Sequence, residues 1–261
     1  MTTEPYTPFP GRSRPRIALL IDADNAPAAK IGDILADLAQ YGETSVRRAY
    51  GNWTKPELKG WAGVLHERAI RPVQQYDYSK GKNASDMAMV VEAMALLYTE
   101  RPDAFAIVSS DADFTPLVMH LREKGLDVYG YGQKKAPEPF QSACSRFTDL
   151  NQIGDEDDEP APAAASAEQG QPTERRTRLT TNELKGDSAL VALLRKAVAS
   201  AADESGWATV NSVGNRIANQ SSQDPRNYGY ASWSKLLKAS ELFEVKDEGT
   251  SHVSVRDPRE R

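Results

Sequence analysis

The chain has 261 residues, of which 39% are hydrophobic and 26% are charged, and its formal net charge is −5. These values are typical of a globular protein, and no run approaches the roughly 20 apolar residues that a membrane span requires. The sequence therefore excludes an integral membrane protein, and we expect no membrane partner.

The beginning of the chain and its cysteine content indicate a cytoplasmic protein. Residues 1–15 are polar and rich in proline, without the apolar core of a secretory signal peptide. Cys144 is the single cysteine, so it cannot form a disulfide within the chain, which fits a reducing compartment. We interpret Cys144 as a small buried residue and not as a nucleophile, because no histidine lies near it in the sequence.

Short apolar runs alternate with amphipathic segments along the first 150 residues. An uninterrupted apolar run such as 17–21 is typical of a strand that is buried on both faces, and spacing of three and four residues indicates a helix. Strand–helix alternation predicts a mostly parallel sheet covered by helices on both faces. We expect strands at 17–21, 46–50, 70–73, 105–108 and, as the last one, 128–131, and helices at 31–38, 58–66, 87–98 and 114–122.

The negative charge of the chain is concentrated after this first block. Residues 151–183 carry 3 basic and 8 acidic side chains, whereas residues 1–150 carry 18 and 19 and residues 184–261 carry 11 and 10. An acidic run at 155–159 and an Ala/Pro/Ser/Gln-rich stretch bury too little apolar surface to offset the entropy of folding. We predict that 151–183 is a disordered linker between a domain at 16–150 and another at 184–256.

The last block has a different pattern. Helical spacing covers 190–198, Asn211 or Ser212 could cap a short helix that ends near 218, and Ser232 could cap another. Two short alternating segments, 243–245 and 252–255, flank a turn around Gly249. Three helices followed by a hairpin predict a small winged helix-turn-helix domain.

Acidic residues follow the two most apolar strands and begin the most apolar helix of the first block. Ligands bind beyond the carboxyl ends of strands in open parallel sheets, so these acids should converge at one edge. Carboxylates gathered in this way suit Mg²⁺ or Mn²⁺, which lowers the pKa of an attacking water, and a nearby amide could orient a carboxylate. The acids are Asp22, Asp24, Asp86, Asp111 and Asp113, and the amide is that of Asn25.

Two alternatives remain open for these charged residues. Asp22, Asp24 or Asp113 taken singly could be a helix N-cap, because a carboxylate accepts hydrogen bonds from the first amides of a helix. Four lysines could rim the site and bind phosphate, or could be solvated surface charges. They are Lys80, Lys82, Lys134 and Lys135.

Several of these motifs together resemble the NYN domain of the PIN-like nuclease superfamily, in its LabA/DUF88-like branch. The residues that carry the resemblance are 21–25 (IDADN), 82–86 (KNASD), 109–114 (SSDADF), 129–132 (YGYG) and 134–138 (KKAPE). The resemblance implies a Rossmann-like α/β fold and metal-dependent cleavage of RNA. It also implies a role for Asp22, Asp86, Asp111 and Asp113 as metal-holding acids, with Asn25 as their polar partner. Glu92 stands where many relatives have Asp, and Ser110 stands where many have Gly.

The last block resembles an OST-HTH, or LOTUS, domain through residues 206–208 (GWA), 224–230 (DPRNYGY) and 236–239 (LLKA). This resemblance implies binding to RNA or to a protein partner. The candidates for contact with phosphates or bases are Arg226, Tyr228, Lys235 and Lys238, because an aromatic ring can stack on an unpaired base for about 1–3 kcal/mol.

We therefore expect a metal-dependent ribonuclease with a tethered RNA-binding domain, acting on single-stranded or structured RNA. One alternative is an RNA-binding adaptor with an inactive site. Another is an aspartyl phosphatase of the HAD-like class, since Asp22 and Asp24 after a first strand also suit a nucleophile with a neighbouring acid. The RNA substrate stays open, as does the choice between endonuclease and exonuclease, and a homo-oligomer is possible.

Overall fold

The computed structural model describes residues 14–76, 84–133, 135–153, 178–203, 205–247 and 253–259. The chain divides between residues 154 and 155 into two compact units, the first unit and the second unit. None of the helices in the described ranges combines the length and the apolar character that crossing a bilayer requires.

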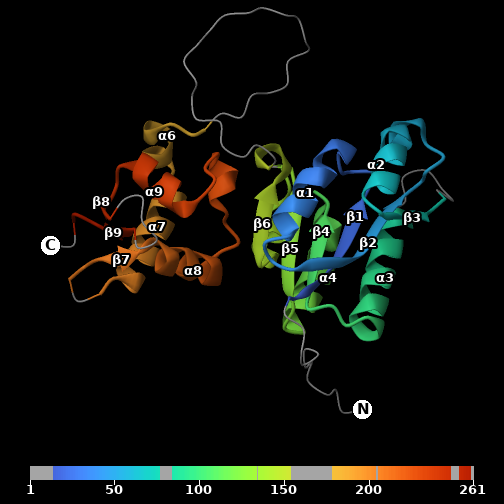
Figure 1. The fold of residues 1–261 in the computed structure, drawn as a ribbon, viewed down its shortest axis with the longest axis horizontal. Helices are drawn as coiled ribbons and strands as arrows, with labels where there is room; N and C mark the ends of the chain where they lie inside the picture. The colour runs from blue at the N-terminus through green and yellow to red at the C-terminus, as the bar shows by residue number, and fades with distance from the viewer. Residues whose placement is uncertain are drawn as a thin grey trace, which may run out of the picture. The chain divides into compact units, whose positions relative to one another are not determined.

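A six-stranded parallel sheet forms the centre of the first unit (Figure 1). Its order is β3-β2-β1-β4-β5-β6, and every pair of neighbours runs parallel. The chain winds outward from β1 to β3, returns to the centre and winds the other way from β4 to β6, which is the Rossmann order. The strands are β1 (Arg16–Asp22), β2 (Glu43–Gly51), β3 (Arg71–Gln74), β4 (Ala104–Val108), β5 (Asp127–Gly132) and β6 (Arg146–Asp149).

Helices cover both faces of this sheet, as predicted. One face carries α1 (Ile31–Leu38) and α2 (Trp61–Glu67), preceded by the 3-10 turns η1 (Ala28–Lys30) and η2 (Pro56–Gly60). The other face carries α3 (Ala84–Thr99), α4 (Thr115–Glu123) and α5 (Glu138–Ala143), with η3 (Ala112–Phe114) before α4. A further turn, η4 (Leu150–Gln152), follows β6.

Successive side chains of β1 belong to two separate hydrophobic clusters. Ala18 and Leu20 pack with α3, α4 and α5, whereas Ile17, Leu19 and Ile21 pack with α1 and α2. Since side chains alternate between the faces of a strand, a strand between two helix layers must be apolar at every position. The predicted doubly buried strands at 17–21 and 105–108 are therefore confirmed.

The prediction that the strand near 128–131 is the last one is wrong, because α5 and β6 follow it. Phe140, Cys144 and Phe147 of this segment are buried in the cluster of α3 and α4. Cys144 and Phe147 fit closely over Gly130, where a Cβ atom would lie 2.5 Å from the Cys144 sulfur. Cys144 is buried as expected, and burial raises the pKa of its thiol to about 12, which does not suit a nucleophile.

The second unit combines four helices with a small antiparallel sheet of order β7-β9-β8 (Figure 1). This is the predicted arrangement of helices followed by a hairpin, although the turn around Gly249 lies outside the described residues. The elements are α6 (Thr181–Gly186), α7 (Ser188–Ala201), β7 (Ala208–Thr209), α8 (Val210–Gln220), η5 (Pro225–Tyr228), α9 (Trp233–Ser240), β8 (Glu244–Lys246) and β9 (Ser254–Arg256).

Capping residues explain where two of these helices differ from the prediction. The first, α6, begins inside the range assigned to the linker, because Thr180 and Glu183 form a reciprocal capping box. The cap of α8 is Thr209, whose side chain accepts a hydrogen bond from the Ser212 amide, and is not Asn211 or Ser212. Ser232 caps α9 as predicted.

Candidate functional site

The carboxyl ends of β1 and β4 bring together acidic residues that are almost 90 positions apart in the sequence. β1 ends at Asp22, and Asp111 and Asp113 lie in the turn that follows β4. β1 and β4 are neighbours at the point where the winding of the sheet reverses, which is where parallel α/β sheets bind ligands. The predicted convergence of acids at one edge therefore has its structural basis in the strand order.

The Asp22 carboxylate is held by hydrogen bonds to only one of its two oxygens. The Asn25 amide and the Ser109 hydroxyl both donate to Oδ2, at 2.8 and 2.9 Å. Oδ1 is buried and has no hydrogen-bond partner among the described residues, and the whole residue is only 1% exposed. Burial raises the pKa of Asp22, the two donors lower it, and the charge of Asp24 adds to the increase.

Ser109 connects the Asp22 carboxylate to the turn after β4. Its hydroxyl also accepts a hydrogen bond from the Asp111 amide at 3.1 Å. Asp111 then caps η3, with its Oδ1 atom accepting from the Asp113 amide at 2.9 Å. The capping role that the sequence offered to Asp113 therefore belongs to Asp111, and the Asp113 side chain is exposed.

Asp86 lies in the first turn of α3, opposite the other acids. Burial raises the pKa of its carboxyl to about 6, and the negative charges of the surrounding acids add to the increase. A like charge nearby disfavours ionisation, so the shift indicates that these carboxylates share one small region. The contributing acids are Asp22, Asp111, Asp113 and Asp24.

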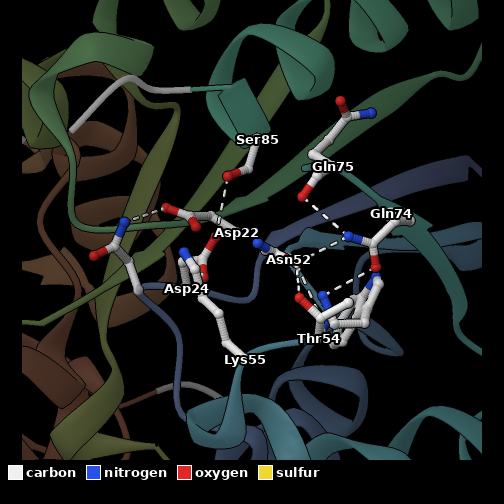
Figure 2. A network of polar contacts seen from close by, with 10 residues as sticks. Asp22, Asp24, Asn52, Thr54, Lys55, Gln74, Gln75 and Ser85 are labelled. Carbon is white, nitrogen blue, oxygen red and sulfur yellow. Dashed lines mark hydrogen bonds and ion pairs between the residues drawn. The ribbon is translucent and has the colours of Figure 1, made fainter. Parts of the chain in front are cut away.

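Asp24 is bound by two partners that the sequence did not indicate (Figure 2). The Ser85 hydroxyl donates to its Oδ2 atom at 3.0 Å, and the Lys55 ammonium lies 3.3 Å from its Oδ1 atom. Ser85 directly precedes Asp86, and Lys55 lies in the loop after β2. The sequence signal for Ser85 and Ser109 is their place in the 82–86 and 109–114 motifs, one and two residues before a candidate acid.

The donor set at this edge fits a hard divalent cation. Mg²⁺ prefers oxygen ligands and keeps several waters, so it needs only one or two carboxylates from the protein. A cation would supply a partner for Asp22 Oδ1, which has none among the described residues, and would offset the burial and the neighbouring charges that raise the pKa of Asp86. Among the described residues, no group of three or more acidic, histidine or cysteine side chains already has the arrangement of a complete metal site.

The two positions that depart from the NYN pattern have partners of their own. Ser110 accepts a hydrogen bond from the Gln133 amide at 2.8 Å, which connects the turn after β4 to the end of β5. Glu92 forms an ion pair with Arg48 and accepts a hydrogen bond from the Tyr50 hydroxyl at 3.2 Å. Glu92 therefore connects α3 to β2.

The predicted basic rim lies mostly beyond what the structure describes. Lys80, Lys82 and Lys134 fall outside the described residues, and Lys135 is exposed at the loop after β5. A role for all four in phosphate binding stays a prediction.

In the second unit, two of the four predicted RNA-contact residues have roles inside the domain. Arg226 forms an ion pair and two hydrogen bonds with the fully buried Asp224, with the closest atoms 2.7 Å apart. The Tyr228 hydroxyl donates to Gln223, and burial raises its pKa to about 12. Contact of Arg226 and Tyr228 with RNA stays a prediction, and both side chains also stabilise the domain through these internal contacts.

Lys235 and Lys238 are the other two predicted RNA-contact residues. Both are exposed on α9. Their contact with RNA stays a prediction, and the exposure of both side chains is compatible with it.

Comparison with known proteins agrees with this architecture. The NYN domain family matches residues 16–151, and the OST-HTH/LOTUS domain family matches residues 185–255. The uncharacterized protein MJ0482 of Methanocaldococcus jannaschii is 29% identical over 146 residues, which cover 54% of this chain and 56% of that protein. The chain thus matches little more than half the length of this relative.

Two solved structures are similar at low sequence identity. A protein of unknown function from Vibrio parahaemolyticus, VPA0982, is 17% identical with a TM-score of 0.44, over 52% of this chain and 93% of that chain. Acinetobacter baumannii MurG is 16% identical with a TM-score of 0.31, over 52% of this chain and 37% of that chain. The family matches, the Rossmann strand order and the acids at the sheet edge agree with one another. The chain belongs to the NYN domain family and carries an OST-HTH/LOTUS domain in its second unit.

Proposed function

We propose that the first unit is a divalent-metal-dependent ribonuclease and that the second unit binds the RNA substrate. The observation that carries the proposal is the Asp22 carboxylate, which is 1% exposed and yet has an Oδ1 atom without a hydrogen-bond partner in the part of the chain that the structure describes. A buried polar atom without a partner costs about 1–3 kcal/mol, and more if it is charged. Such an atom beside other acids favours a cation as the missing partner.

Hydrolysis of a phosphodiester requires attack by water on phosphorus, loss of the bond to the leaving oxygen, and transfer of a proton to that oxygen. A bound Mg²⁺ or Mn²⁺ would lower the pKa of the attacking water and compensate the negative charge that develops on the leaving oxygen. Asp22, Asp86, Asp111 and Asp113 would hold this ion. Asn25 and Ser109 would orient the Asp22 carboxylate, because both donate to Oδ2 and leave Oδ1 for the ion.

The second unit would increase the local concentration of RNA at the site. When one of two linked domains has bound an RNA, the effective concentration of that RNA at the other domain can reach about the millimolar range. Membership of the NYN family supports RNA cleavage over the phosphatase alternative. For the second unit, α9 is the proposed contact helix, because Lys235 and Lys238 are both exposed on it.

The decisive experiment is a cleavage assay on labelled single-stranded RNA and DNA with Mg²⁺, Mn²⁺ or EDTA. Asp22→Asn and Asp111→Asn should reduce cleavage by at least about 100-fold while RNA binding is retained, since charge compensation at a reacting centre contributes several kcal/mol. Glu123→Gln is the matched control, because this exposed acid ends α4 at the opposite edge of the sheet. Cleavage by Asp22→Asn at the wild-type rate would refute the site.

One observation favours the RNA-binding adaptor as the second candidate. The described acids do not already form a complete metal site, so the chain could bind RNA without cutting it. Wild-type protein that binds RNA and leaves it intact in every divalent metal would establish this alternative. Loss of binding in Lys235→Glu and Lys238→Glu would still locate the RNA contact on α9.

A further inference from the structure

A side-chain hydrogen bond connects the start of α3 to the loop after β1. The Ser85 hydroxyl donates to Asp24 Oδ2 at 3.0 Å, and Asp86 is the next residue along the helix (Figure 2). Asp24 is two residues beyond Asp22, at the end of β1. This hydrogen bond therefore joins the segments that carry two of the candidate metal-holding acids.

The other oxygen of Asp24 is bound to Lys55. The ammonium lies 3.3 Å from Oδ1, and the two side chains are 36% and 22% exposed, so the pair is partly shielded from solvent. Lys55 offsets part of the charge of Asp24 and binds the oxygen that Ser85 does not. One carboxylate thus connects three segments: the loop after β1, the loop after β2 and the first turn of α3.

The loop that carries Lys55 is itself fixed to β3. Asn52 Oδ1 accepts hydrogen bonds from the Thr54 amide, the Thr54 hydroxyl and the Gln74 side-chain amide, at 3.3, 2.6 and 3.0 Å (Figure 2). Gln74 Oε1 in turn accepts from the Trp53 amide at 3.1 Å. Because Asn52 is only 9% exposed, these contacts form a rigid base for the loop.

We propose that Asp24, Lys55 and Ser85 form a brace that positions Asp86 at the metal site, with the Asn52–Gln74 contacts as its base. The inference rests on the proposed function, because it assigns the brace to the same metal-holding acids. None of the three brace residues is catalytic; they act through Asp86.

A brace is needed for an electrostatic reason. Asp86 follows Ser85 in the first turn of α3, and carboxylates that gather at one site repel one another, so this turn needs a contact that holds it in place when no cation is bound. Farther along the helix, Leu96 and Leu97 are buried in the core and fix that end of α3. The Ser85–Asp24 hydrogen bond opposes the repulsion at the end where the acid lies.

The test uses the full chain with Ser85→Ala, and with Ser85→Thr as the variant that restores a hydroxyl. Thr99→Ala is the matched control, because it removes a hydroxyl that donates to the Ala95 carbonyl at 2.9 Å near the other end of α3. Calorimetric titration with MnCl₂ measures metal affinity, and hydrogen exchange of the metal-free protein measures opening of the first turn. RNA cleavage is the third measurement.

Ser85→Ala should weaken Mn²⁺ binding and lower the cleavage rate by roughly 10-fold, as loss of a partner that orients a metal ligand does. It should also speed hydrogen exchange at the start of α3, whereas Ser85→Thr and Thr99→Ala should match wild type. Unchanged Mn²⁺ affinity in Ser85→Ala, or an equal loss in Thr99→Ala, would overturn the brace.

Failure of the proposed function would be seen separately, as wild-type protein that neither cleaves RNA nor binds Mn²⁺. Hydrogen exchange of the metal-free protein then tests whether the Ser85–Asp24 hydrogen bond holds the first turn of α3 in place. Faster exchange confined to the first turn of α3 in Ser85→Ala would support the brace, and unchanged exchange would refute it.

Discussion

Replacing Asp86 by Asn should stabilise the metal-free protein at neutral and alkaline pH. The pKa of the Asp86 carboxyl rises from 3.8 to about 6, first because of burial and then because of the neighbouring acids. A rise from 3.8 to about 6 corresponds to about 3 kcal/mol. Because the side chain is partly exposed, solvent screening reduces this penalty to about 1 kcal/mol. Asn is uncharged and nearly isosteric, so it removes the repulsion without leaving a cavity.

The sign of the pH dependence follows from the raised pKa. Well below pH 3.8 the carboxyl is protonated in both the folded and the unfolded chain and costs nothing. Between pH 3.8 and about 6 the folded protein still holds a proton that the unfolded chain has lost, so the free energy of unfolding falls across this range and levels off above it. The advantage of Asp86→Asn should therefore be complete at pH 8 and should disappear as the pH approaches 4.

Thermal unfolding in EDTA measures this effect. At pH 8 the variant should unfold about 3 °C above wild type, which is the shift that about 1 kcal/mol produces in a domain of this size. Glu123→Gln, at the exposed end of α4, should leave the midpoint unchanged at both pH values. An Asp86→Asn protein that unfolds below wild type at pH 8 would refute the reasoning, because burial of the charge and repulsion from the neighbouring acids would then not be destabilising at this position.

Two further changes test the packing and the buried charge. Gly130→Ala should lower the free energy of unfolding by about 1–3 kcal/mol, because its Cβ would lie 2.5 Å from the Cys144 sulfur. Gly63→Ala, with open space around the new methyl group, should raise the free energy of unfolding by about 0.5–1 kcal/mol. Equal thermal midpoints for the two variants would contradict this. Arg226→Ala should destabilise the second unit by about 3–5 kcal/mol, because it removes an ion pair and two side-chain hydrogen bonds to the buried Asp224. An Arg226→Ala chain with unchanged thermal unfolding and weaker RNA binding would instead make Arg226 a contact residue.

The sequence alone predicted the elements whose signals are local. The apolar runs at 17–21 and 105–108 became β1 and β4, because a strand between two helix layers needs apolar side chains on both faces. Ser232 caps α9 as predicted, because a serine cap is recognised within one turn of chain. The short segments α5 and β6 were missed, since four to six residues show too little periodicity and are stabilised by packing over Gly130.

The acids of the candidate site were also indicated by the sequence, but their partners were not. Asp22 and Asp111 could be proposed as neighbours because both follow buried strands, and the ends of parallel strands share one edge. Ser109 is bound to Asp22 across 87 positions. Lys55, which precedes β3 in the sequence, and Ser85, which follows it, both bind Asp24. Those contacts depend on β1 lying between β2 and β4. Strand order is a property of the whole folded sheet, which no single stretch of residues encodes, so only the tertiary structure could place these side chains together.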